Sequence, residues 1–209
     1  MKTLKESLLD IDSVQSSLEP IKIIGDWCKE NIKGSYKIDP KTLDINSNGD
    51  IEIINKDITE IPGYIHFGRV GGDFNCNWCK NLTSLRGCPK EVGGNFDCFK
   101  CNNLTSLKGA PKEVGGWFDC SNCNSLTSLE GAPEKVDSHF YCSNCNSLTS
   151  LEGGPKEVDG RFYCYDCKKL TSLEGAPKVV NGDFNCSNCG KKFTEDDVKK
   201  VCNTKEIGV

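Results

Sequence analysis

The stretch "FDCSNCNSLTSLEGAPEKV", from Phe118 to Val136, decides the fold because close copies of it recur along the chain. The first cysteine of each copy returns every 22 residues, at Cys76, Cys98, Cys120, Cys142, Cys164 and Cys186. A phenylalanine, a valine, a pair of leucines and a proline keep the same period. A fixed period of this length is the signature of a solenoid, in which each unit buries its apolar face only against its neighbours.

The residues of one unit indicate how it folds. The phenylalanine and the first cysteine are two residues apart, so they share one face of a strand. We expect one such strand per unit, stacked on the next as parallel rungs about 4.8 Å apart. Glycine pairs such as Gly93 and Gly94 permit a tight backbone entry to the strand. The Leu-Thr-Ser-Leu-x-Gly-x-Pro segment supplies an irregular return path, because proline cannot continue a regular ladder.

Aligned on this period, each unit reads V-x-x-x-F-x-C-x-x-C-x-x-L-T-S-L-x-G-x-P. It resembles the leucine-rich repeat, with valine, phenylalanine and the first cysteine at three leucine positions and the second cysteine in the Asn/Cys column. Over about residues 50–209, the repeat sequence is similar to that of short leucine-rich-repeat proteins of tailed bacteriophages and some large viruses. The resemblance implies an α+β repeat solenoid, a right-handed and slightly curved stack of about six short parallel strands.

The N-terminal part of the chain departs from the repeat, as the cap of a solenoid must. Residues 1–45 are expected to be helical, with one helix near the N-terminus and a second over residues 20–33. Residues 46–69 are expected to form a hairpin and cap, because Asn48 and Gly49 provide a turn between two β-prone runs.

The solenoid is expected over residues 70–191, and a C-terminal cap over residues 192–209. Thr194 is a good N-cap residue, with acidic residues in the following turn and lysines in the last. The sequence therefore predicts a capping helix that covers the last rung with Phe193, Val198 and Val201.

The Cys-x-x-Cys pairs allow three interpretations. The spacing between adjacent pairs falls within the zinc-ribbon range, so a structural zinc site is one. Disulfides between rungs are another, because the rung spacing lies within the Cα separation that a disulfide accepts. The third, which we favour, is that the cysteines are packed as small apolar residues. Equivalent rungs place the sulfur atoms in continuous columns, whereas a zinc ion needs four that converge.

Composition and charge narrow the function classes. The formal net charge of −4 argues against binding to a nucleic-acid backbone, which needs a basic stripe. No secretory signal or membrane-length apolar run is visible, so we expect no membrane association. Because the fifteen cysteines are odd in number, a reducing cytoplasm fits better than a disulfide framework.

No constellation typical of catalysis appears in the sequence. The two histidines, His66 and His139, lie in different units, and no phosphate-binding glycine loop, zinc-protease pattern or nucleophile elbow is present. We therefore expect no enzymatic activity and no cofactor.

The strand positions that face away from the core vary between units while their inward neighbours barely change. The middle units concentrate aromatic and charged residues there, and Trp, Tyr and Arg are the residues that dominate binding hot spots. Aromatic cross-strand pairs that only stabilise the sheet are the alternative. The predicted partner-binding residues are Phe99, Trp117, Asp119, His139, Tyr141, Arg161, Tyr163 and Tyr165.

The leading hypothesis is a non-enzymatic interaction module that binds a protein partner through its concave strand face. The resemblance to phage proteins implies a host or viral target and interference with a host process such as antiviral defence. The alternatives are a zinc-binding structural protein and a protein that sequesters a small ligand or nucleotide. Self-assembly through an uncovered end rung is disfavoured by the caps, so we expect a monomer.

Overall fold

Each repeat unit folds into one coil that carries two short strands. In the computed structural model, which describes residues 4–54 and 56–209, the valine lies on one strand and the phenylalanine on the next. The chain turns between these strands at a glycine pair. A Cβ added to Gly115 would lie 2.4 Å from the carbonyl oxygen of Gly93 in the preceding coil. The expectation of one strand per unit is therefore wrong, because this tight corner separates the valine from the phenylalanine.

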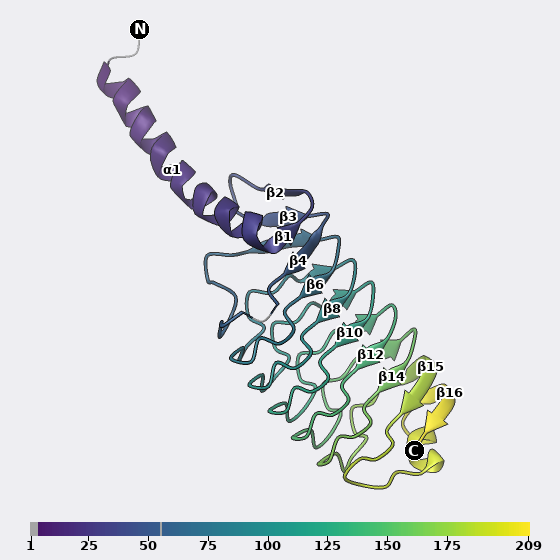
Figure 1. Cartoon of the computed structure of the whole chain (residues 1–209). Coiled ribbons are helices and arrows are strands. Elements are labelled where there is room, and N and C mark those ends of the chain that lie inside the picture. The colour runs from purple at the N-terminus through teal and green to yellow at the C-terminus, as the bar shows by residue number, and fades with distance from the viewer. Residues whose placement is uncertain (1–3, 55) are drawn as a thin grey trace.

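The two kinds of strand form two parallel stacks, which Figure 1 shows as an elongated β-solenoid of about seven coils. The phenylalanine stack contains β4 (Asp50–Glu52), β6 (Phe74–Asn75), β8 (Phe96–Asp97), β10 (Phe118–Asp119), β12 (Phe140–Tyr141) and β14 (Phe162–Tyr163). The valine stack contains β3 (Ile45–Ser47), β5 (Phe67–Val70), β7 (Glu91–Val92), β9 (Glu113–Val114), β11 (Lys135–Val136) and β13 (Glu157–Val158). The long strand β15 (Val179–Asn185) runs through the corner and pairs with both stacks.

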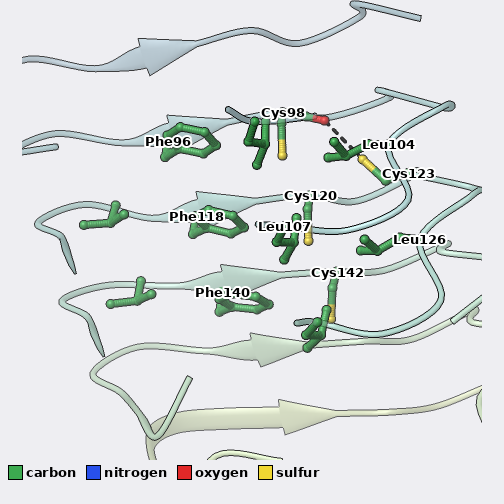
Figure 2. Close-up of a cluster of buried hydrophobic side chains, with 14 of the residues drawn as sticks. Phe96, Cys98, Leu104, Leu107, Phe118, Cys120, Cys123, Leu126, Phe140 and Cys142 are labelled. Carbon is green, nitrogen blue, oxygen red and sulfur yellow. Dashed lines mark hydrogen bonds between the residues drawn. The ribbon is translucent and has the colours of Figure 1, made fainter. Parts of the chain in front are cut away.

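Columns of identical residues from successive coils fill the core between the two strand stacks. The phenylalanines pack face to face, with ring centroids 5.1 Å apart for Phe96 and Phe118 and for Phe118 and Phe140. Figure 2 shows the columns of first cysteines and leucines beside them. These residues are fully buried, and aromatic rings supply the largest apolar area per residue. The register between coils is therefore set by buried side chains that pack against the equivalent residues of the neighbouring coils.

The N-terminal segment forms one helix, α1 (Leu4–Asn31), which points away from the coil stack in Figure 1. Two helices were expected, but α1 continues through Pro20, since a proline removes one helical hydrogen bond without always ending the helix. Ile24 and Cys28, near its C-terminal end, are buried against the first coil. No helix in the described ranges is long and apolar enough to cross a membrane.

The hairpin expected around Asn48 and Gly49 does not form. Strands β3 and β4 are instead the valine-type and phenylalanine-type strands of the first coil, and Gly49 belongs to their corner. The antiparallel pairing comes from the preceding residues: β1 (Ile32–Lys33) pairs with β4, and β2 (Tyr36–Ile38) pairs with β3. This segment thus covers both strands of the first coil and closes the N-terminal end.

The C-terminal cap contains the expected helix and an additional strand. Helix α2 (Glu195–Lys199) begins after Thr194, whose side chain and that of Asp197 form a capping box, so the predicted helix is confirmed. Phe193 and Val198 are buried, and Val201 is partly buried. Strand β16 (Asn203–Gly208), which the sequence pattern did not predict, pairs in parallel with β15 and covers its edge.

Candidate partner-binding face

The outward positions of the phenylalanine strands form continuous columns. The register places Asp119 beside Tyr141, and Tyr141 beside Tyr163, on successive coils. Residues two apart on an extended segment share a face, so the residues before each phenylalanine and after each first cysteine belong to the same surface. Seven of the eight predicted binding residues are partly buried, and Arg161 is exposed.

The middle coils gather the aromatic residues of this surface, which we call the aromatic patch. Its ring contacts join His139 to Tyr141 (centroids 5.7 Å apart), Tyr141 to Tyr163 (5.8 Å) and Tyr163 to Tyr165 (6.0 Å). The patch consists of Trp117, His139, Tyr141, Arg161, Tyr163 and Tyr165; Trp117 is placed beside His139 by strand register.

Arg161 gives the aromatic patch its positive charge. Its guanidinium carbon lies 6.0 Å from the centroid of the Tyr163 ring, and its Nε lies 3.2 Å from a carboxylate oxygen of Asp183. Its backbone N–H donates to Nδ1 of His139 at 2.9 Å. Burial raises the pKa of the Tyr141 hydroxyl, while Arg161 opposes that shift, so Tyr141 is neutral at physiological pH.

The same columns perform a structural task in other coils, where Asp or Asn side chains accept backbone hydrogen bonds. Before the phenylalanine, Oδ1 of Asn95 accepts from the N–H of Trp117, one coil on, at 2.9 Å. After the phenylalanine, Oδ1 of Asp119 accepts from the N–H of Ser121 at 2.7 Å. Asp97 and Asn185 make the same bond in their own coils. These bonds hold the corner and the turn that flank each phenylalanine strand.

Three residues of the aromatic patch replace these acceptors. Trp117 stands in the column of Asn95, while Tyr141 and Tyr163 stand in the column of Asp97 and Asn185. None of these three side chains has an acceptor close to the backbone. After Tyr141, the N–H of Ser143 instead donates to Oγ of Ser121 in the preceding coil, at 3.2 Å. The aromatic residues therefore occupy positions where the scaffold favours Asp or Asn.

Asp119 borders the aromatic patch, but it carries a partly buried carboxyl group in place of a ring. Burial raises the pKa of its carboxyl group to about 6, and the neighbouring Asp97 adds a smaller repulsion. Its hydrogen bond with Ser121 opposes this shift but does not cancel it. Asp119 thus combines a role in turn closure with a position beside the patch.

Phe99 lies apart from the aromatic patch. Its ring contacts Trp78 edge-on, with centroids 6.1 Å apart, and the ammonium group of Lys100 lies 4.0 Å from the centroid of Trp78. Trp78 has 40% of its surface exposed, and it is not among the predicted partner-binding residues. A signal was available, because Trp78 and Lys100 occupy a column that holds Asn or Asp in the four following coils, at Asn122, Asn144, Asp166 and Asn188.

The second cysteine of each pair has a defined hydrogen-bonding role. The thiol of Cys123 donates to the carbonyl oxygen of Cys98 at 3.2 Å, the bond drawn dashed in Figure 2. Equivalent bonds of 3.2–3.3 Å are made by Cys101, Cys145, Cys167 and Cys189. The cysteines that the structure describes form no disulfides with one another. We call this column of bonds the thiol ladder.

Burial suppresses ionisation of the cysteines. It raises the pKa of Cys186 and of Cys167 to about 12, and it raises the pKa of Cys142 and Cys164 well above the usual range. Thiolate is the form that attacks electrophiles and binds metals, so these groups are poor nucleophiles and poor ligands as they stand. Within the described part of the chain, no group of three or more His, Cys, Asp and Glu residues is arranged to hold a metal ion.

Comparisons with protein-family models, with curated proteins and with solved structures found no match to this chain.

Proposed function

We propose that this protein is a non-enzymatic interaction module that binds a protein partner through the outward face of its phenylalanine strands. The carrying observation is the replacement of coil-closing acceptors by Trp117, Tyr141 and Tyr163. A scaffold role would favour Asp or Asn at these positions, as in the neighbouring coils. Large rings that sit together on a surface with an arginine have the composition of a binding hot spot.

We further propose that the coils are leucine-rich-repeat units, wound right-handed, with the strand face on the concave side. The 22-residue period and the thiol ladder in the Asn/Cys column support this assignment. We also propose a cytoplasmic location, because an odd number of cysteines fits a reducing compartment better than a disulfide framework. We also propose a bacteriophage origin and a role against host defence, because the repeat sequence resembles that of short leucine-rich-repeat proteins of tailed bacteriophages.

A capture experiment with a scaffold-restoring variant tests the proposal. Trp117→Asn, Tyr141→Asn and Tyr163→Asn together give each position a residue type found in its own column, so the fold should be retained. Wild-type protein and the variant are immobilised and exposed to bacterial lysate, with Tyr64→Asn as a single change at an exposed aromatic residue outside the aromatic patch. A partner held by wild type and Tyr64→Asn but lost by the triple variant supports the proposal. A partner retained by all three proteins would overturn the assignment to this face.

A further inference from the structure

A second candidate site surrounds Trp78, which lies two coils before Trp117, the first residue of the aromatic patch. In every repeat the residue before the second cysteine has a left-handed backbone, with φ between 57° and 61° from Trp78 to Asn188. Asn and Asp tolerate this conformation best among residues that carry a side chain, whereas a bulky residue is strained by it. Four coils use Asn or Asp here, but Trp78 and Lys100 do not.

The strain at Trp78 is not offset by burial. Its side chain is among the exposed large apolar groups of the described residues, while Asn or Asp would satisfy the same turn. An exposed aromatic group held in an unfavourable backbone conformation is a feature of binding sites rather than of cores.

The surroundings of Trp78 are cationic although the chain as a whole is acidic. A cavity of about 320 Å³ beside the ring is lined by Lys56, Asp57, Trp78, Lys80 and Asn81. Asp57 accepts a hydrogen bond from the side-chain amide of Asn81. Lys56 and Lys80 have no ion pair among the described residues, and Lys100 lies over Trp78 and near Phe99. The local balance is three lysines against one aspartate.

We propose that this cluster is a binding site for a planar ring that carries a phosphate group, with a nucleoside phosphate as the source that fits best. The ring would stack on Trp78, since base–aromatic stacking contributes about 1–3 kcal/mol per base. Lys56, Lys80 and Lys100 would neutralise the phosphate as point charges. The hollow is open to solvent, and its volume lies at the lower end of the range for small-molecule sites, about 300–1,000 Å³, which fits a small ligand held by one ring face and nearby lysines.

The test is calorimetric titration of the full chain with adenosine monophosphate, phenyl phosphate, adenosine and inorganic phosphate. We expect saturable binding of at least one ring phosphate, with adenosine and inorganic phosphate weaker by at least about tenfold. Preference for adenosine monophosphate identifies a nucleotide source, and preference for phenyl phosphate an aryl phosphate such as phosphotyrosine. Absence of saturable binding by both ring phosphates would overturn the proposal.

Two variants separate a binding role from a structural one. Trp78→Asn restores the residue type of the other coils, so it should abolish ring-phosphate binding without lowering Tm. Lys56→Ala with Lys80→Ala should weaken binding at least about tenfold. If Trp78→Asn unfolds at a clearly lower temperature, or binds the ring phosphate as tightly as wild type, Trp78 is part of the scaffold and the site assignment fails.

Discussion

At the scale of single residues, this fold is explained by side chains that contact the equivalent residue, or the equivalent coil position, in the next coil. The thiol ladder is the clearest case, because the thiol of each second cysteine donates a hydrogen bond to a carbonyl group of the preceding coil, as Cys123 does to Cys98. Cysteine suits this position since it is small, readily buried and still a weak donor. A single Cys-x-x-Cys pair suggests a zinc site. Only the geometry of the stacked coils shows that the second cysteine is a buried hydrogen-bond donor.

Removing one thiol should therefore cost stability without any metal being involved. Cys123→Ala deletes a hydrogen bond and leaves a small void, so we expect a loss of about 1–2 kcal/mol in the free energy of unfolding. Urea unfolding measures it. Cys88→Ala is the matched control, because alanine already stands in that column at Ala110, Ala132 and Ala176. Its effect should stay within about 0.5 kcal/mol. Equal losses of unfolding free energy in both variants would contradict a stabilising role for the hydrogen bonds of the thiol ladder.

Asp119 predicts an unusual pH dependence. Its pKa in the folded chain, about 6, exceeds the ordinary value of 3.8. Folding therefore favours the protonated form, and this contribution is present below about pH 4 and lost as the pH rises to about 6. Asp119→Asn keeps the acceptor for Ser121 and removes the charge. It should be about 1–2 kcal/mol more stable than wild type near pH 7, allowing for solvent screening, and equal near pH 4.

Urea unfolding of Asp119→Asn and wild type at the two pH values checks this prediction. A variant that is less stable than wild type near pH 7 would show that the ionised carboxylate stabilises the turn.

At the scale of elements, the two ends of the solenoid are closed in different ways. The N-terminal end uses antiparallel strands and α1, whereas the C-terminal end uses α2 and the parallel strand β16. The outer edge of β16 carries charged residues, Lys205 and Glu206, which oppose further strand pairing. We therefore expect this arrangement to protect the long strand β15 from pairing with other chains.

Deleting residues 203–209 should expose that edge. Because β15 is seven residues long and pairs with both stacks, its unpaired backbone groups would then be free to pair with another chain. We expect the shortened protein to associate in a concentration-dependent way and to melt at a lower temperature than the full chain. Light scattering after size-exclusion chromatography measures the first effect. A shortened chain that stays monomeric at every concentration would show that β16 does not protect the edge.

The sequence predicted the coils well because each column repeats five or more times, so a weak preference becomes a strong pattern. The α2 helix was predictable from a local capping signal at Thr194. The split into two strands was not, since it depends on how closely Gly93 and Gly115 approach each other across coils. Strand β16 was missed because its residues lack the repeat pattern and gain their conformation from β15. The departure of Trp78 from a column of Asn and Asp is visible in the sequence, but the left-handed backbone that makes it costly is not.

At the scale of the whole molecule, a solenoid of equivalent coils should tolerate the loss of one complete unit. Deleting residues 93–114 joins Lys-Glu-Val to Gly-Gly, as in the natural chain, and removes one 22-residue period. We expect a folded, cooperatively unfolding protein with one coil fewer, since each coil contacts only its neighbours. Circular dichroism and urea unfolding test this. Deletion of residues 93–103, half a coil, should abolish folding because it breaks the 22-residue register. A folded half-coil variant would contradict the claim that folding depends on stacking of equivalent coils.

If the aromatic patch serves binding, the scaffold alone should prefer Asp or Asn at three of its positions, those of Trp117, Tyr141 and Tyr163. The most direct measurement is the free energy of unfolding of the Trp117→Asn, Tyr141→Asn, Tyr163→Asn variant in urea. We expect a stability equal to or above that of wild type, because the new side chains restore acceptors for neighbouring backbone groups. A loss of more than about 2 kcal/mol would contradict it and show that the rings are cross-strand supports of the sheet.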